Sequence, residues 1–173
     1  MLNNISLKAI GDGDQDFLFR VYADTRAEEL AQTGWPAEQQ LDFLKMQFDA
    51  QHKHYTEYYP EASLNVIMLG GVSIGRLYVS RWENQIRIVD IALLSQYCGQ
   101  KIGSQLLVGL MDEAKSKLQE VSIHVEKNNP AMQWYLRLGF VFLEDKGVYS
   151  LMKTAFFVSG KPGYLEPVES RDD

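Results

Sequence analysis

The sequence predicts one mixed α/β domain, with a mostly antiparallel central sheet of about seven strands and helices on both faces. Three observations predict this class. At 173 residues the chain is long enough to bury one full core and short for two. Its composition, 46% hydrophobic and 23% charged, is that of an ordinary globular protein. Its apolar patterns give the order β, α, α, β, β, β, α, β, α, β, β.

The N-terminal part is predicted to form one strand followed by two helices. Residues 5–10 ("ISLKAI") alternate apolar and polar side chains, which is typical of a strand, and "GDGDQ" supplies a turn with a candidate Asp cap. Apolar side chains spaced by three and four residues predict a helix from Phe17 to near Gly34. A second helix is expected to start at Pro36, because proline suits the first helical turn.

Strand patterns dominate the middle of the chain. Two apolar runs flank Gly70 and Gly71, a dipeptide that closes tight hairpins, and residues 86–94 ("IRIVDIALL") predict the third strand of a meander. The remaining pattern predicts a helix from residue 102, a strand at 121–125, a helix at 130–138, and strands at 140–143 and 148–157. We expect residues 1–158 to form the domain, and the polar, acidic residues 159–173 to form a C-terminal tail.

Charge and composition exclude several function classes. The formal net charge of −6 argues against a general nucleic-acid binder, which needs a basic face. No apolar run approaches the roughly 20 residues that span a bilayer, and the start lacks a signal-peptide pattern, so we expect a cytoplasmic protein without a membrane partner. Cys98 is the only cysteine, which excludes an internal disulfide. His52 and His54 would face apart on a helix, so no metal site is expected.

The segment "SQYCGQKIGS" (residues 95–104) joins a predicted buried strand to a predicted helix. Gly99 and Gly103 allow a tight turn and a close approach of the backbone to a ligand. The amides of the first helical turn lack carbonyl partners and favour phosphate groups. The spacing fits neither a Walker loop nor a Rossmann fingerprint. A phosphate-binding loop and a plain strand-to-helix corner both remain open at this point.

A second segment supports the ligand-binding interpretation. Residues 125–140 ("VEKNNPAMQWYLRLGF") resemble the second half of the Gcn5-related N-acetyltransferase (GNAT) pattern, in which a strand ending in Val leads to Asn, Ala, Tyr and then Leu-Gly-Phe. Residues 98–103 ("CGQKIG") resemble its first half. Cys98 stands where the family usually has Arg or Gln, and Lys101 stands where it usually has Gly. Together with the element order, the resemblance covers nearly all of the chain before the tail.

The resemblance implies that acetyl-CoA is the co-substrate. Its pyrophosphate would lie on backbone amides of the glycine loop, and its pantetheine arm would run beside the end of the preceding strand. The residues implied to contact it are Ile91, Leu93, Leu94, Cys98, Gly99, Gln100, Lys101, Ile102, Gly103, Ser104, Asn129 and Tyr135.

Two residues are candidates for proton transfer. Tyr135 is the expected acid, because a phenol with a pKa of roughly 10 can protonate a departing thiolate; the alternative is a core tyrosine on an apolar helical stripe. Asp90 is the candidate base, because a carboxylate on a central strand must be paired or functional, and pairing with a nearby Arg is the alternative. The family often carries a catalytic Glu near the position of Arg87, which cannot act as a base.

The predicted function is direct transfer of an acetyl group to a primary amine of a small molecule or a peptide. Asn129 also fits a helix N-cap before Pro130, and Gly139 fits a helix C-cap. A non-catalytic acyl-CoA-binding module with the same fold is the alternative function, and an interaction protein is a third. The oligomeric state stays open, with a homodimer as one option. The resemblance places the acceptor near Glu28, Glu29, Trp35 and Tyr78.

Overall fold

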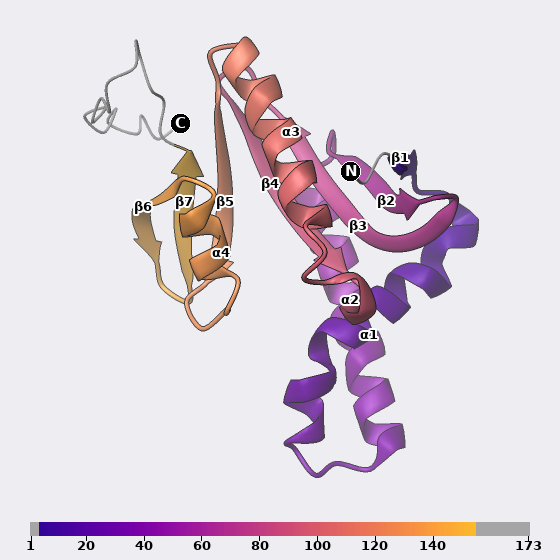
Figure 1. Cartoon of the computed structure of the whole chain (residues 1–173). Coiled ribbons are helices and arrows are strands. Elements are labelled where there is room, and N and C mark those ends of the chain that lie inside the picture. Colours follow the sequence, from indigo (N-terminus) through magenta and orange to yellow (C-terminus); the bar gives the residue numbers. More distant parts are fainter. Residues whose placement is uncertain (1–3, 155–173) are drawn as a thin grey trace. The chain divides into compact units, whose positions relative to one another are not determined.

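The structure is a computed structural model that describes residues 4–154 (Figure 1). The predicted order of helices and strands is confirmed, with two short 3-10 helices in addition. The elements are β1 (Ile5–Ala9), η1 (Asp12–Asp14), α1 (Gln15–Ala31), α2 (Ala37–Tyr58), β2 (Ser63–Leu69), β3 (Val72–Arg81), β4 (Gln85–Leu93), η2 (Ser95–Tyr97), α3 (Ile102–Ser116), β5 (Glu120–Glu126), α4 (Met132–Arg137), β6 (Phe140–Lys146) and β7 (Tyr149–Thr154). The predicted tail and the predicted end of the last strand, at residue 157, lie outside the described residues.

The strands form a seven-stranded sheet in the order β1-β2-β3-β4-β5-β7-β6. The pairs β1–β2, β2–β3, β5–β7 and β6–β7 are antiparallel, which confirms the predicted mixed α/β class. The chain divides into two compact units, unit 1 (Met1–Arg81 with Ile88–Leu106) and unit 2 (Trp82–Arg87 with Leu107–Asp173).

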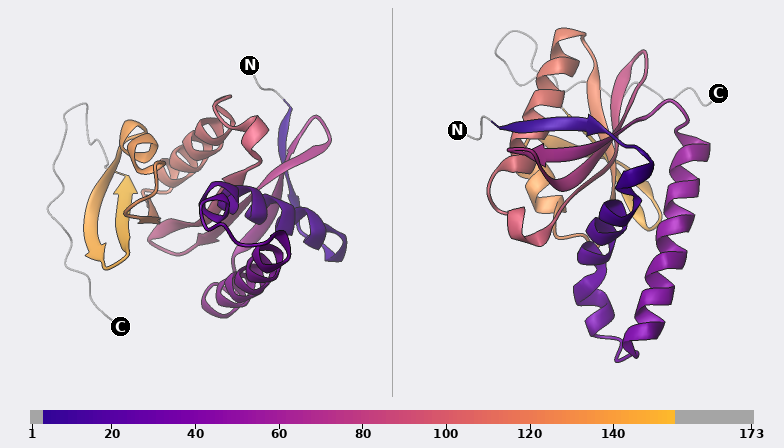
Figure 2. Two further views of the ribbon diagram at one scale, coloured as in Figure 1. Left: turned by 90° about the horizontal axis from the view of Figure 1, so that it is seen from below. Right: turned by 90° about the vertical axis from the view of Figure 1, so that its right-hand side faces the viewer.

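The helices of unit 1 pack on its strands through one apolar cluster. Leu18 and Tyr22 of α1, Phe48 of α2 and Val66 of β2 are its buried members. The Phe19 ring meets Phe48 edge to face at 5.5 Å, an arrangement that aromatic pairs favour. Figure 2 shows α1 and α2 running side by side, with the turn between them at one end of the pair. The cluster thereby fixes both helices against β2.

The predicted Asp cap of the first helix has a different role. Asp14 precedes α1, but its carboxylate makes no cap hydrogen bond to the helix. It accepts the Gly11 N–H at 2.8 Å and the Lys8 ammonium at 2.8 Å instead. These two contacts hold the pKa of Asp14 below its usual value, with the Lys8 hydrogen bond as the largest cause. The carboxylate therefore stabilises the turn that precedes the helix.

A bulge and a glycine bring β3 close to the end of β4. The register pairs Ile67 with Gly75 and Met68 with Ser73, which leaves Ile74 as an extra residue on β3. The Ile74 carbonyl accepts the Leu94 N–H at 2.9 Å. A Cβ atom on Gly75 would lie 2.3 Å from the carbonyl oxygen of Ala92. A side chain at this position is therefore incompatible with the approach of the two strands.

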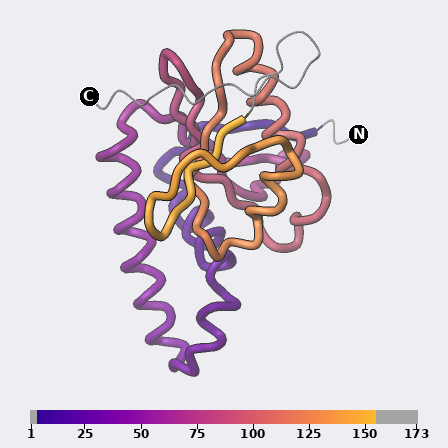
Figure 3. Tube along the Cα trace, turned by 90° about the vertical axis from the view of Figure 1, so that its left-hand side faces the viewer, coloured from indigo at the N-terminus to yellow at the C-terminus, as the bar shows by residue number. Residues whose placement is uncertain are grey.

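In unit 2, β5, β7 and β6 form an antiparallel sheet, which Figure 3 traces together with α4. Val121, Ile123 and Val125 are buried and alternate along β5 with Ser122 and His124. The buried set forms the apolar face of this strand, and Ser122 and His124 lie on the opposite face.

Among the described helices, none combines the length and the apolar character needed to cross a bilayer.

We predict that Gly75→Ala destabilises the fold by about 3 kcal/mol, because the added methyl group meets backbone that cannot move aside. The melting temperature in a thermal-unfolding scan should fall by roughly 6 to 12 °C. Gly109→Ala is the matched control: a Cβ there meets nothing within 4 Å, and alanine favours the interior of α3. Equal melting temperatures for the two variants would contradict the clash.

Candidate active site

The glycine loop follows β4 in unit 1 and is anchored at its start. The Ser95 N–H donates to Asp24 Oδ2 at 2.6 Å, and the Ser95 hydroxyl donates to Asp24 Oδ1 at 3.3 Å. The Leu94 N–H bond to Ile74 adds a second anchor on β3. Gln100 Nε2 donates to the Gln96 carbonyl at 2.9 Å across the loop. Contacts from α1 and β3 therefore fix the loop before α3 begins.

The backbone of the loop is left-handed at two residues. Gly99 has a φ of +75° and Lys101 has a φ of +64°. Glycine adopts this backbone conformation at no energetic cost, whereas the same conformation costs a residue with a Cβ atom about 1 kcal/mol of conformational free energy. Lys101 therefore takes the backbone conformation that a glycine would take, and its side chain is exposed.

The start of α3 presents backbone amides beside this loop. The first turn closes when the Gln105 N–H donates to the Lys101 carbonyl at 3.0 Å, so the amides of Ile102 and Gly103 precede the hydrogen bonds of the helix. With 15 residues, α3 is long enough for its dipole to favour an anion at this end. The geometry of residues 99–104 therefore suits a phosphate or pyrophosphate group.

The residues that were predicted to contact the cofactor differ in how deeply their side chains are buried. Leu94 and Ile102 are buried core side chains, so they can offer a ligand only their backbone. Ile91 and Leu93 are half-buried on β4. The Cys98 thiol points back toward the Leu93 and Leu94 carbonyls, at 3.8 and 3.7 Å. Burial and the nearby Asp24 raise the pKa of Cys98, which disfavours the thiolate that a nucleophile requires.

Asp90 is paired with an arginine that the sequence analysis did not identify. Asp90 Oδ2 accepts Arg76 Nη2 at 2.7 Å and the Tyr55 hydroxyl at 2.7 Å. Arg76 Nη2 also donates to Gln51 Oε1 at 2.8 Å. The Arg76 guanidinium lies over the ring of Tyr78 at 5.4 Å. The expected alternative for Asp90, pairing with an arginine, is confirmed, and the sequence signal was a single Arg inside the apolar strand pattern of residues 72–80.

Burial and neighbouring charges shift the pKa values of Arg76, Tyr55 and Tyr78. Arg76 is 3% exposed, and burial by itself would lower its pKa, but the Asp90 carboxylate and the neighbouring phenols raise that pKa and keep the guanidinium charged. Burial and then Asp90 raise the pKa of Tyr55, so Tyr55 remains a hydrogen-bond donor. Burial also raises the pKa of Tyr78. Arg76 Nε is buried without a hydrogen-bond partner among the described residues.

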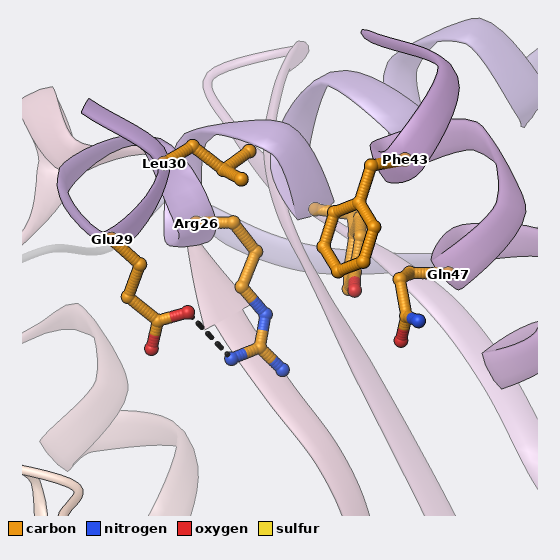
Figure 4. A pocket seen from close by; sticks show the side chains of 6 residues that line it. Arg26, Glu29, Leu30, Phe43 and Gln47 are labelled. Atoms are coloured by element: carbon orange, nitrogen blue, oxygen red, sulfur yellow. Dashed lines mark hydrogen bonds and ion pairs between the residues drawn. The ribbon is translucent and has the colours of Figure 1, made fainter. Parts of the chain in front are cut away.

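A hollow of about 170 Å³ opens between α1 and α2 (Figure 4). Arg26 Nη1 pairs with Glu29 Oε2 at 3.4 Å at its edge, and the Arg26 guanidinium lies 5.6 Å from the Tyr22 ring. An apolar group with a polar end would suit this mixture of aromatic, aliphatic and charged side chains. Its lining residues are Tyr22, Arg26, Glu29, Leu30, Phe43 and Gln47.

The predicted acceptor residues do not converge on this hollow. Glu29 lines it, whereas Glu28 is exposed on α1. Trp35 lies in the turn before α2, where its ring meets Phe43 at 5.4 Å. Tyr78 is 2% exposed and packs against Tyr55 and Arg76. Contact of Tyr78 with an acceptor therefore stays a prediction, in a position that this structure shields from solvent.

Asn129 and Tyr135 both belong to unit 2, in the turn before α4 and on α4 itself. Asn129 Oδ1 accepts the Ala131 N–H at 2.9 Å in the turn before α4. The expected N-cap at Asn129 is wrong, because α4 begins at Met132 and its N-cap residue is Ala131. Tyr135 is buried on α4, and its ring meets Phe140 edge to face at 5.6 Å. Gly139 ends this segment at a φ of +97°, the left-handed conformation of the predicted C-cap.

We predict that Lys101→Gly stabilises the protein by about 1 kcal/mol, because glycine relieves the left-handed backbone. The melting temperature should rise by roughly 2 to 4 °C. Lys115→Gly, in the regular last turn of α3, is the matched control and should destabilise by about 1 kcal/mol. A destabilisation of the same size in both variants would show that position 101 is not strained.

We predict that Asp90→Asn destabilises the protein by about 3 kcal/mol, because it leaves the Arg76 charge buried without a counter-charge. Arg76→Gln should cost a similar amount, and the double variant should lose clearly less than the sum of the two single losses. Urea unfolding of all four proteins measures this coupling. Simple additivity would contradict the pairing.

Comparisons with known proteins identify the family and the fold. Residues 21–140 match the Acetyltransferase (GNAT) family. No significant match was found among curated protein sequences. Among solved structures, PaiA N-acetyltransferase from Thermoplasma acidophilum in complex with coenzyme A is 17% identical, with a TM-score of 0.66 and coverage of 87% of this chain and 98% of that chain.

Two further solved structures share the fold. A GNAT family acetyltransferase from Elizabethkingia anophelis with acetyl-CoA bound is 16% identical, with a TM-score of 0.55 and coverage of 88% of this chain and 98% of that chain. Arabidopsis thaliana Naa50 in complex with the bisubstrate analogue CoA-Ac-MVNAL is 17% identical, with a TM-score of 0.57 and coverage of 88% and 99%. Acetyl-CoA is the co-substrate of this family. Because the family match spans more than half of the chain, this protein belongs to the GNAT family of acetyltransferases.

Proposed function

We propose that the chain is an acetyl-CoA-dependent N-acetyltransferase that transfers the acetyl group directly to a primary amine of a small molecule or a peptide. The observation that carries the proposal is the anchored loop at residues 95–101, with left-handed residues at Gly99 and Lys101, at the N-terminus of α3. That combination places backbone amides beside the positive end of a helix dipole, which suits the pyrophosphate of coenzyme A. Membership of the family supports the same co-substrate.

The residues of the loop fit this ligand. Backbone amides of residues 99–104 would hold the pyrophosphate, and the exposed Lys101 ammonium would pair with a phosphate oxygen. The backbone at Ile91 and Leu93 would border the pantetheine arm. Bound acetyl-CoA supplies an activated thioester carbonyl. The chain must align the acceptor amine, stabilise the charge that develops on the carbonyl oxygen and supply a proton to the departing sulfur.

For that proton we propose the Tyr135 hydroxyl. The Phe140 contact and burial on α4 hold the ring in one orientation, which supports a positioned acid. Asn129 would contact the arm of the co-substrate from the turn that precedes α4. Asp90 is proposed as a base that acts from within its pair with Arg76, through the Oδ1 atom that accepts neither the Arg76 nor the Tyr55 hydrogen bond.

The acceptor is proposed to enter by the hollow between α1 and α2. The Glu29 carboxylate at its edge suits a cationic amine, and the rings of Tyr22 and Phe43 suit an apolar neighbour of that amine. Glu28 and Trp35 would extend the same surface toward the turn before α2. The peptide-bearing analogue in the Naa50 structure supports peptides as one acceptor class to test.

The alternative is a non-catalytic acyl-CoA-binding module. Two observations favour it: Cys98 replaces the usual polar residue of the loop with a thiol that points back to β4, and the acceptor residues do not converge on one hollow. Both functions require the co-substrate to bind. Turnover with an amine panel separates them.

We predict that acetyl-CoA at a hundredfold excess over its dissociation constant stabilises the protein by about 2.7 kcal/mol, because it binds the folded state alone. A thermal-unfolding scan should show a rise of roughly 5 to 10 °C in melting temperature. ATP and NAD are the controls and should give smaller shifts. The absence of a shift at millimolar acetyl-CoA would overturn both the enzyme and the binding module.

We predict that Tyr135→Phe lowers kcat about a hundredfold or more while the dissociation constant of acetyl-CoA stays the same, because only the proton donor is lost. Stopped-flow turnover and calorimetric titration measure the two quantities. Tyr149→Phe, at a 43% exposed tyrosine of β7, is the matched control and should keep full turnover. An unchanged kcat in Tyr135→Phe would assign the residue to the core.

A further inference from the structure

Two charged side chains are buried in the part of the chain that the structure describes, Arg76 and Arg87. Arg76 pairs with Asp90, as most buried charges must pair with an opposite charge. Arg87, on the part of β4 that belongs to unit 2, is 8% exposed and has no carboxylate partner among residues 4–154. Its charge is therefore desolvated without a counter-charge from the described protein.

Every contact of the Arg87 guanidinium is with a neutral group. Its Nε donates to Ser122 Oγ at 2.8 Å, and its Nη1 lies 3.2 Å from His124 Nδ1. The guanidinium also lies 5.2 Å from the centre of the Trp82 ring. The Ser122 hydroxyl donates in turn to Gln85 Oε1. These contacts hold the guanidinium in one orientation but leave its charge uncompensated.

His124 accepts a hydrogen bond from Arg87 and does not neutralise its charge. A guanidinium can only donate hydrogen bonds, so His124 Nδ1 is the acceptor and the imidazole carries its proton on Nε2. Burial, Arg87 and Lys146 lower the pKa of His124 against the opposing effect of Glu144, which keeps the ring neutral. Glu144 is itself paired with Lys146 at 3.0 Å. The nearest acid that acts on His124 therefore already has a cation of its own.

We propose that Arg87, held in place by Ser122 and His124, forms a binding site for a carboxylate group. The planar guanidinium presents donors in a fork that matches the two oxygens of a carboxylate. The contacts with Ser122 and His124 hold this guanidinium in place. A carboxylate supplies the counter-charge that the buried arginine lacks. Two sources have this chemistry: a small molecule that carries a carboxylate, and the acidic side chains of residues 166–173 of this chain. The site lies wholly within unit 2 and does not depend on acetyl transfer.

The test is an NMR titration of the full chain with sodium acetate at constant ionic strength, read on the imidazole resonances. The His124 resonances should shift and saturate, while those of His52 and His54 on α2 serve as internal controls and stay in place. Arg87→Gln should weaken acetate binding at least about tenfold, because a charged hydrogen-bonding partner is lost. Arg137→Gln, an exposed arginine of α4, is the matched control and should bind acetate normally.

A second variant covers the case in which Arg87→Gln does not fold. Arg87→Lys keeps the charge but loses the fork, so acetate should bind more weakly than to the parent protein and still saturate. A variant with Glu166→Gln, Glu169→Gln, Asp172→Asn and Asp173→Asn separates the sources. Displaced His124 resonances in this variant before acetate is added support the chain's own carboxylates; unchanged resonances with saturable acetate binding support an external one. A His124 shift that chloride reproduces, or that persists in Arg87→Gln, overturns the proposal.

Discussion

The buried ion pair between Arg76 and Asp90 is the interaction on which the packing of β3, β4 and α2 in unit 1 depends. It joins β3 to β4, and Tyr55 and Gln51 connect α2 to the same two side chains. Burying two charges costs several kcal/mol per ion, so the pair persists only with this full set of hydrogen bonds. Asp90 lies five residues before Ser95, where the glycine loop is anchored, so the pair also fixes the strand from which the loop departs.

Backbone features of β3 also fix the end of β4 and the start of the glycine loop. The extra residue Ile74 turns a β3 carbonyl toward the end of β4, and Gly75 lets the two backbones approach more closely than any side chain would allow. Asp24 then holds the first residue of the loop. The backbone strain energy at Lys101 is small compared with the stabilisation from the contacts that anchor the loop. A residue with a side chain can therefore occupy this left-handed position.

Local patterns predicted the elements well, because apolar periodicity, caps and turn residues act over a few positions. The order of helices and strands and the left-handed Gly139 after α4 are of this kind. The expected N-cap at Asn129 was wrong, because α4 begins two residues later than the Asn-Pro pattern predicts. Contacts between distant residues were not predictable: Tyr55 meets Asp90 across 35 positions. Spacing shows which residues share a face but not which faces meet, so only Glu29 of the four expected acceptor residues lines the hollow.

Arg76 and Arg87 both carry a buried positive charge, but only the charge of Arg76 has a carboxylate partner among the described residues. Both guanidinium groups are buried, but a carboxylate on β4 neutralises Arg76, whereas Arg87 meets a hydroxyl, an imidazole and an indole ring. A carboxylate near position 87 would accept protons, as the GNAT pattern often requires. A guanidinium there cannot, and its charge attracts anions instead. An arginine at this strand position therefore cannot take part in proton transfer, and the role proposed for it is anion recognition.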